Sequence, residues 1–217
     1  AACAVRPLVR RPPSGAGIAQ LQYSLMTPAI PAKTTRALRA LSFAYFVQAT
    51  GALSVVGSLN AISREWGLAD AQSVYLISFF GVTFAFAAPF LQVGFGHLRR
   101  RRQVLIGLSL FSAAALLFAA APNYSVLVLS RVLMGLGAGF IGPVLGALGS
   151  SLVEPRHQGS AIAIVLLGLS IAGLVGMPLS AWVAHVWGAR ALFVAIACAG
   201  AATAALIVAV VPDSSEG

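Results

Sequence analysis

Arg131 is the residue of this sequence whose type and position are best suited to chemistry. It stands in an apolar stretch, and a helix that begins near Tyr124 would carry it several residues into the membrane. A central arginine costs about 2.5 to 3.5 kcal/mol there, so it should face a wet cavity. Gln48 and Asn60, in an earlier apolar stretch, are uncharged groups that can hydrogen-bond a solute. The alternative is that residues 132–153 alone span the membrane, which leaves Arg131 snorkelling at the outer interface.

All acidic residues of the sequence lie outside the apolar stretches, so no carboxylate is placed there to carry a proton. They are Glu65, Asp70, Glu154, Asp213 and Glu216. The sequence has no Gly-x-Ser-Gly nucleophile motif and no phosphate-binding glycine loop. Cys3 and Cys198 give neither a disulfide framework nor a metal-ligand spacing. We therefore expect no enzyme activity, no metal site and no cofactor.

The elements that must position Arg131 are six uncharged stretches, each longer than the 18 or so residues that cross a bilayer as a helix. They cover residues 40–63, 71–96, 103–130, 132–153, 158–189 and 191–212. The stretches lack the alternation of a barrel strand. The composition is also typical of a membrane protein, with 59% hydrophobic residues, 9% charged residues and a mean hydropathy of +0.92. The predicted fold class is an all-α polytopic membrane protein with six transmembrane helices.

Basic residues gather in every second gap between these stretches, which orients the chain by the positive-inside rule. Eleven of the fourteen Lys and Arg lie in the N-terminal segment, in residues 99–102 and at Arg156, whereas the opposite gaps hold only Arg64 and Arg190. Both termini are therefore expected in the cytoplasm. A net charge of +9 would suggest nucleic acid for a soluble protein, but these charges stand at span ends. Membrane lipids with anionic head groups are the expected partners, and nucleic acid is not.

Two stripes of small residues recur at helical spacing. The first follows Arg131 on its own helix face and consists of Gly135, Gly139, Gly142 and Gly146. The second consists of Gly168, Ala172 and Gly176, and it precedes Pro178. Small residues let a neighbouring helix approach closely or widen a pore, and a proline removes a backbone hydrogen bond and can bend its helix. Ordinary packing and a gating or coupling role both fit these residues.

The chain divides into three parts. Residues 1–38 are expected to form a disordered basic tail, and residues 39–212 the six-helix bundle. Residues 1–25 contain no acidic residue and precede Met26, so they are either translated upstream of the true start or a transit peptide. Residues 213–217 are a cytoplasmic tail or the beginning of a central linker, in which case a second half is missing.

Four segments, in the same order, resemble the major facilitator superfamily, and within it the twelve-helix drug:proton antiporters and arabinose-efflux-like permeases. Residues 89–105 resemble the family's Gly-x-Leu-x-Asp-Arg-x-Gly-Arg-Arg loop. Leu127-Val-Leu-Ser-Arg-Val-Leu-Met-Gly-Leu-Gly-Ala-Gly139 resembles its Leu-x-x-x-Arg-x-x-x-Gly-x-Gly pattern. Residues 168–178 resemble the antiporter motif of the fifth helix, and Gly188-Ala-Arg-Ala-Leu-Phe193 resembles the Gly-Trp-Arg-x-x-Phe that opens the sixth. The resemblance implies the N-terminal six-helix half of a twelve-helix fold.

The basic loop departs from the family pattern, because Gly96 stands at the position of its Asp. The basic loop consists of Arg99, Arg100, Arg101 and Arg102. It is either a positive-inside anchor or a cytoplasmic gate, and for the second role Arg100 and Arg101 match the family best.

The resemblance implies a secondary active transporter in the plasma (inner) membrane of a bacterium. It would export a small organic solute, such as a drug or a sugar, by alternating access, with protons as a candidate coupling ion. Arg131, Gln48 and Asn60 would line the substrate and coupling cavity, and a C-terminal six-helix half or a second copy would complete the pathway. The alternatives are a uniporter or uptake permease, and a non-transporting half-transporter or truncated membrane scaffold. Substrate, direction and proton coupling stay open.

Overall fold

The computed structural model describes residues 31–211, and all regular structure in that range is helical. The elements are α2 (Ala32–Trp66), α3 (Asp70–Phe95), α4 (Arg100–Ala119), α5 (Tyr124–Ser151), the short 3-10 helix η1 (Pro155–His157), α6 (Gln158–Ile171), the π-helical segment η2 (Ala172–Gly176) and α7 (Met177–Val210). The predicted all-α class is confirmed. The predictions for residues 1–25 and for the tail at 213–217 concern residues outside the described range.

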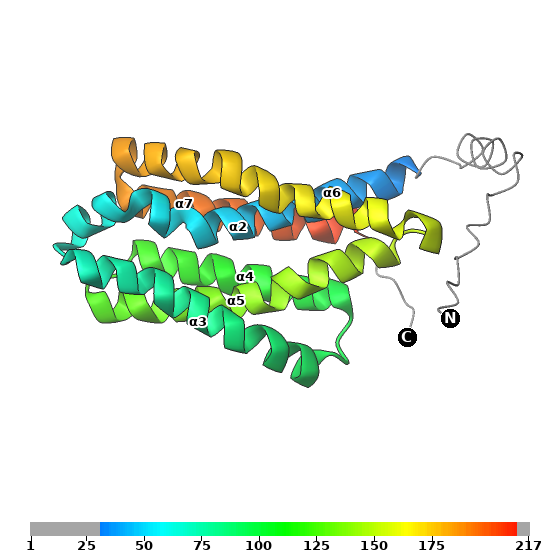
Figure 1. Ribbon diagram of the computed structural model, residues 1–217, viewed down its shortest axis with the longest axis horizontal. Helices are drawn as coiled ribbons and strands as arrows, with labels where there is room; N and C mark the ends of the chain where they lie inside the picture. The colour runs from blue at the N-terminus through cyan, green and yellow to red at the C-terminus, as the bar shows by residue number, and fades with distance from the viewer. Residues whose placement is uncertain (1–30, 212–217) are drawn as a thin grey trace, which may run out of the picture. The chain divides into compact units, whose positions relative to one another are not determined.

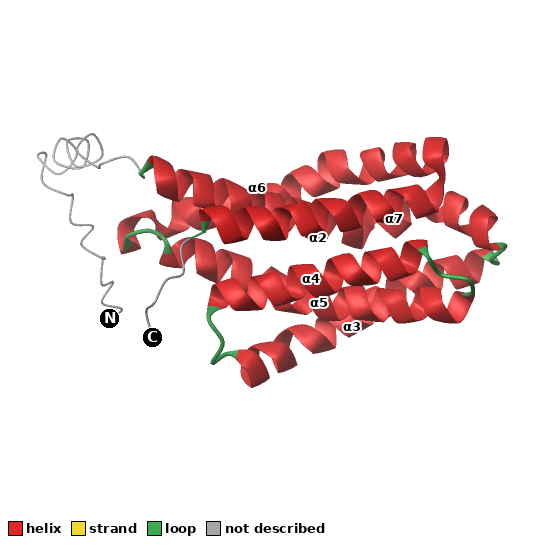
Figure 2. Ribbon diagram, turned by 180° about the vertical axis from the view of Figure 1, so that it is seen from behind, coloured by secondary structure: helices red, strands yellow, loops and turns green. Residues whose placement is uncertain are grey.

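The helices form two layers. In both views α2, α6 and α7 lie on one side, and α3, α4 and α5 on the other (Figures 1 and 2). The most extensive interfaces join α4 to α5, α2 to α7 and α3 to α5. The interface between α4 and α7 connects the two layers. Buried aromatic rings fill that connection, since the rings of Phe118 and Phe193 stack with centres 3.8 Å apart.

Among residues 31–211, five helices are long and apolar enough to cross a membrane, as judged by length and composition. The last is a joined stretch of 56 residues, Pro155–Val210, which combines η1, α6, η2 and α7. Within α7 the backbone of Gly188 is not helical, with φ 87° and ψ 163°, a conformation that essentially only glycine adopts. The chain turns back on itself near the end of the orange segment in Figure 1. The predicted stretches 158–189 and 191–212 therefore lie on the two arms of this joined helix.

The predicted tail of residues 1–38 extends too far, because helix α2 already includes residues 32–38. Lys33, Arg36 and Arg39 are exposed, whereas Leu38 is fully buried. Cations three residues apart share one face of a helix, so a charged stretch can still bury its opposite face. The prediction assigned Lys33 and Arg36 to the tail because it did not consider this spacing.

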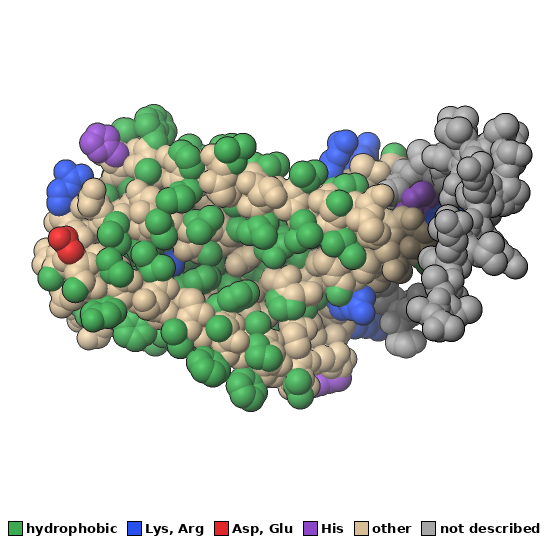
Figure 3. All heavy atoms as spheres, viewed as in Figure 1, with side chains coloured by type: hydrophobic (Ala, Val, Ile, Leu, Met, Phe, Trp, Pro, Cys, Tyr) green, Lys and Arg blue, Asp and Glu red, His purple; other side chains and the backbone are tan. Residues whose placement is uncertain are grey.

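The outer surface of the bundle is apolar. Hydrophobic side chains cover much of the face in Figure 3, and charged side chains lie mainly toward its ends. On α3 the exposed fractions of Phe86, Phe90 and Val93 are 65%, 73% and 87%. An apolar surface this continuous is stable only against lipid or another protein, as in an integral membrane protein.

Candidate functional site

Arg131 lies inside helix α5, whose start is fixed by a side-chain cap. The Oδ1 atom of Asn123 accepts a hydrogen bond from the backbone N–H of Val126 at 3.1 Å. From Tyr124, the first residue of α5, the chain rises by about 10 Å before it reaches Arg131, at 1.5 Å per residue. The Arg131 side chain is 0% exposed. The helix therefore begins before Val132, and the Arg131 side chain is enclosed by the bundle rather than extended to its surface.

The guanidinium of Arg131 is surrounded by groups from two neighbouring helices. Its Nη1 donates to the carbonyl oxygen of Gly51 at 3.3 Å, and its Nη2 to that of Ala52 at 3.2 Å, both on α2. Its Nε donates to the carbonyl of Leu76 on α3 at 3.3 Å, and its Cζ lies 4.7 Å from the centre of the Phe80 ring. Within residues 31–211 no carboxylate pairs with this cation. Carbonyl dipoles and a ring face therefore replace water around it, and Arg131 joins α5 to α2 and α3.

The glycines that follow Arg131 let α5 approach α3, but only over the first part of the stripe. A methyl group on Gly135 would lie 2.9 Å from the backbone oxygen of Phe80, and one on Gly139 would lie 3.1 Å from Cβ of Ala87. A methyl group on Gly142 would make ordinary contacts only, at 3.5 Å. Close packing therefore requires glycine at the first two positions and tolerates a side chain at the third.

The second small-residue stripe packs against α2. A methyl group on Gly168 would collide with the backbone oxygen of Ser42, and one on Gly176 would collide with the Thr50 side chain. The π-helical turn η2 follows Gly168 along the chain and ends at Gly176, two residues before Pro178. A proline ring clashes with the carbonyl four residues earlier in a regular α-helix, and a wider turn relieves that clash. Gly168, Gly176 and Pro178 thus shape one irregular segment that lies along α2.

The structure separates the two amides that were predicted to line a cavity with Arg131. Gln48 is 5% exposed and stands one turn before Ala52, on the face of α2 that meets Arg131. Its Oε1 atom has no hydrogen-bond partner among the described residues. Asn60 is exposed and lies beyond Ser58, where the backbone of α2 departs from helical geometry. Gln48 and Arg131 therefore share an interface, and Asn60 lies apart from it.

The four arginines of the predicted basic loop do not form a loop in the structure, because Arg99 is the N-cap of α4 and residues 100–102 form its first turn. Two of them contact other helices. Nη1 of Arg100 donates to the backbone oxygen of Ala147 in α5, and Nη2 of Arg101 donates to that of Val208 in α7, both at 2.7 Å. Arg102 is exposed. Arg100 and Arg101 thus connect the start of α4 to carbonyl groups near the ends of α5 and α7, where a cation is favoured by the helix dipole.

At the other end of the bundle, three side chains that we name the Glu65 clasp (Glu65, Trp66 and Arg190) connect α2 to α7. The Oε2 atom of Glu65 accepts hydrogen bonds from the backbone N–H groups of Ala189 at 2.7 Å and Arg190 at 3.3 Å. Its Oε1 lies 3.2 Å from Nε of Arg190, whose Cζ is 5.1 Å from the Trp66 ring centre. A carboxylate from α2 therefore caps the helix that starts after Gly188.

The sequence pattern did not predict the Glu65 clasp. Glu65 and Arg190 were recognised only as charges in gaps between apolar stretches. One signal was available, since these two gaps fall on the same predicted side of the membrane and hold residues of opposite charge. The pairing itself was hidden because the two residues are 125 positions apart in the chain.

The chemistry that these groups offer is recognition of a solute and coupling between helices. Within residues 31–211 no group of three or more His, Cys, Asp or Glu is placed to hold a metal ion. The described acidic residues stand at or beside helix ends: Glu65, Asp70 and Glu154. The interior instead offers the buried cation of Arg131 and the unpartnered amide oxygen of Gln48, which suit hydrogen bonding to a polar molecule.

Known proteins resemble this chain in both sequence and structure. The sequence pattern described as Major Facilitator Superfamily matches residues 41–217. A chloramphenicol efflux pump of Mycobacterium tuberculosis is 32% identical over 167 residues, which are 77% of this chain and 40% of that protein. The inner membrane transport protein YdhP of Escherichia coli is 33% identical over 165 residues, which are 75% of this chain and 42% of that protein. The chain thus spans about two fifths of the length of these relatives.

A solved structure shows the same fold. A bacterial homologue of the human lysosomal transporter Spinster, in an inward-facing and unoccupied conformation, matches with a TM-score of 0.75 at 16% identity. The match covers 87% of this chain and 45% of that one, so the described helices correspond to about half of that structure. Because the family pattern extends over most of the sequence, from residue 41 to residue 217, the chain belongs to the Major Facilitator Superfamily.

Proposed function

We propose that this chain forms one half of a secondary active transporter that exports a small organic solute by alternating access. The observation that carries the proposal is its similarity, over 77% of its residues, to a chloramphenicol efflux pump. Family membership makes the protein a transporter rather than an enzyme. A drug-like molecule of this kind is therefore the first substrate to test.

The proposal includes six membrane crossings with both ends in the cytoplasm. A straight helix as long as the 56-residue stretch Pro155–Val210 would extend about 84 Å, more than twice the hydrocarbon thickness of about 30 Å. The break at Gly188 divides this stretch into two arms, each long enough for one crossing. Two crossings there bring the total to six, and the basic residues at the start of α2 and in the basic loop support a cytoplasmic location for both ends.

Transport would use the interface of α2 and α5. Gln48 supplies an amide that can donate and accept hydrogen bonds, and Arg131 supplies a guanidinium held at the same interface. A second six-helix bundle, either a C-terminal half or another copy of this chain, would cover the exposed apolar surface of α3. Rocking of one bundle against the other around a site near the membrane centre would expose the solute to each side in turn.

Accumulation of labelled chloramphenicol in drug-sensitive bacterial cells that express the chain tests this function. We expect lower accumulation than in cells with an empty vector, and restoration of accumulation when a protonophore collapses the proton gradient. Higher accumulation would instead indicate an uptake permease. Unchanged accumulation with chloramphenicol and with a panel of other drugs and sugars would contradict export and favour a non-transporting scaffold.

The Arg131→Ala variant supplies a control for the residue assignment. We expect it to insert into the membrane in normal amount, measured by quantitative blotting of membrane fractions, and to lose export. Export by this variant at an unchanged rate would show that Arg131 does not belong to the transport site. Gln48→Leu should weaken export of solutes that need the amide while preserving the helix.

A further inference from the structure

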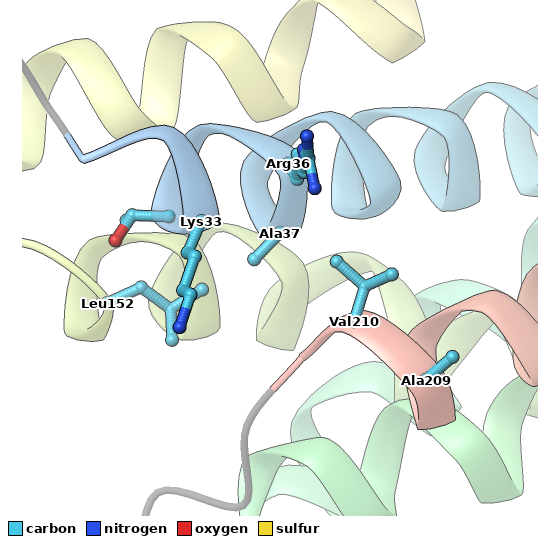
Figure 4. Close-up of a pocket in the computed structure, with 7 residues that line it drawn as sticks. Lys33, Arg36, Ala37, Leu152, Ala209 and Val210 are labelled. Carbon is cyan, nitrogen blue, oxygen red and sulfur yellow. The ribbon is translucent and has the colours of Figure 1, made fainter.

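A cavity of about 400 Å³ lies at the end of the bundle where α2 begins and α7 ends. It is lined by Lys33, Thr34 and Arg36 of α2, by Leu152 just after α5, and by Ala209 and Val210 of α7. Figure 4 shows Lys33 extending from α2 beside Leu152, with Val210 on the other side of the opening. The cavity is separate from the interface that holds Arg131 and Gln48.

Two cations of this cavity have no counter-ion among the described residues. Lys33 and Arg36 are three positions apart, so they share one face of α2, and both are exposed. Neither of them forms an ion pair within residues 31–211. They also belong to the first turns of a long helix, where unpaired backbone N–H groups and the helix dipole favour an anion. The cavity therefore contains two cations that no carboxylate within residues 31–211 neutralises.

The walls of the cavity are apolar. Leu152, Ala209 and Val210 present hydrocarbon to the space between the cations and the end of α7. The end of α7 is held in place by Arg101, which donates to the carbonyl of Val208. The Val208 side chain is 55% exposed on the outer surface of the bundle. A ligand that fits all of these features has an anionic group next to a hydrocarbon part.

We propose that this cavity binds the phosphate head group of an anionic phospholipid. Lys33 and Arg36 would bind the phosphate, while the first carbons of the lipid would contact Leu152 and Ala209. The volume of the cavity lies within the range of small-molecule sites, about 300 to 1,000 Å³. Cations at the ends of spans stand at the level of lipid head groups, whereas a free phosphate ion would leave the apolar walls without a partner.

Binding there would join the two ends of the described chain. The lipid would contact the start of α2 and the end of α7, which are the first and last helices of the bundle. The proposal does not depend on export, because it concerns a different site and is measured by lipid binding.

Native mass spectrometry of the purified full chain, titrated with phosphatidylglycerol or phosphatidylcholine, tests the proposal. We expect at least one tightly bound phosphatidylglycerol and no phosphatidylcholine at the same concentration. Each cation near an anionic head group contributes about fivefold in affinity, so Lys33→Ala/Arg36→Ala should weaken binding about 25-fold. Soluble glycerol phosphate at the same concentration should not compete, which separates a lipid from free phosphate.

Two further variants distinguish this cavity from general surface charge. Arg39→Ala/Arg156→Ala removes the same number of charges from exposed positions that do not line the cavity, and binding should change less than threefold. Ala209→Trp changes no charge but fills the cavity, and binding should be lost. Lys33→Arg/Arg36→Lys should retain binding, because both cations are kept.

Three outcomes would overturn the proposal. Equal binding of phosphatidylcholine and phosphatidylglycerol would show that the cavity does not recognise the anionic charge of the head group. Equal losses in Arg39→Ala/Arg156→Ala and in Lys33→Ala/Arg36→Ala would indicate general surface charge. Lipid binding that occurs only in Asp213→Asn/Glu216→Gln would indicate that Lys33 and Arg36 form ion pairs with carboxylates of the chain itself.

Discussion

Replacement of Arg131 by Met should leave the folding stability nearly unchanged while it abolishes transport. Met is also long and unbranched but carries no charge, and it packs readily into irregular spaces. The carbonyl groups of Gly51, Ala52 and Leu76 that bind Arg131 lie within helices. In an α-helix each such carbonyl also accepts a bond from the N–H four residues later, so removal of the guanidinium leaves no acceptor unpaired.

The magnitude follows from opposing terms that nearly cancel. Burial of an arginine at the centre of a membrane helix costs about 2.5 to 3.5 kcal/mol. Three hydrogen bonds between membrane helices return on average about 0.6 kcal/mol each. The contact of the cation with the Phe80 ring adds about 1 kcal/mol. The favourable terms together reach about 3 kcal/mol, so Arg131→Met should change the free energy of unfolding by about 1 kcal/mol or less.

Reversible unfolding in mixed micelles measures that change, and the accumulation assay measures transport in the same variant. Leu76→Ala is the matched positive control, because it deletes a fully buried side chain and should cost about 2 to 5 kcal/mol. A loss of more than about 3 kcal/mol in Arg131→Met would refute the reasoning and make Arg131 a structural residue. Retained transport in a stable Arg131→Met protein would refute its functional assignment.

Three other predictions test the remaining features. Glu65→Ala should lower the free energy of unfolding by about 2 kcal/mol, and Glu65→Gln by about half as much, because the carboxylate caps two backbone N–H groups; equal stability of all three proteins in mixed-micelle unfolding would contradict the clasp. Gly168→Val should cost about 3 kcal/mol in the same assay through its collision with α2, whereas Gly146→Ala, with open space around it, should stabilise by about 0.5 to 1 kcal/mol. For orientation, a cysteine at Arg156 should react with an impermeant maleimide only in inverted vesicles, and one at Asp70 only in intact cells; the reverse pattern would invert the proposed topology.

The membrane helices could be predicted because charged side chains are unfavourable in hydrocarbon, so each span appears in the sequence as a long stretch without charged residues. Their boundaries needed finer signals. The uncharged stretches place the last boundary at Arg190, whereas the family resemblance opens the last helix at Gly188. The structure places the turn at Gly188, where the backbone needs a conformation that only glycine adopts readily. The start of α2 was predicted too late, because Lys33 and Arg36 were assigned to a tail without regard to their helical spacing.

The position of Arg131 inside its helix followed from the predicted start near Tyr124, which the structure confirms with a cap at Asn123. Its acceptors did not follow, because backbone carbonyl groups carry no signature in a sequence and those of Gly51 and Leu76 belong to distant segments. The Glu65 clasp was missed for the same reason. Both features are long-range contacts, which a single sequence records only as isolated residues.

The glycine stripe after Arg131 shows how one pattern can contain two environments. Gly135 and Gly139 meet the backbone of α3, whereas a methyl group on Gly146 would meet no atom within 4 Å. Periodicity places all these residues on one face, but it cannot indicate where the neighbouring helix diverges, as α3 does from α5 along its length in Figure 1. Close packing against α3 explains why Gly135 and Gly139 are glycines, but it does not explain why residue 146 is a glycine. In the proposed transporter, a second bundle or a solute would occupy the space that α3 leaves open, and its close contact with α5 would require a small residue at position 146.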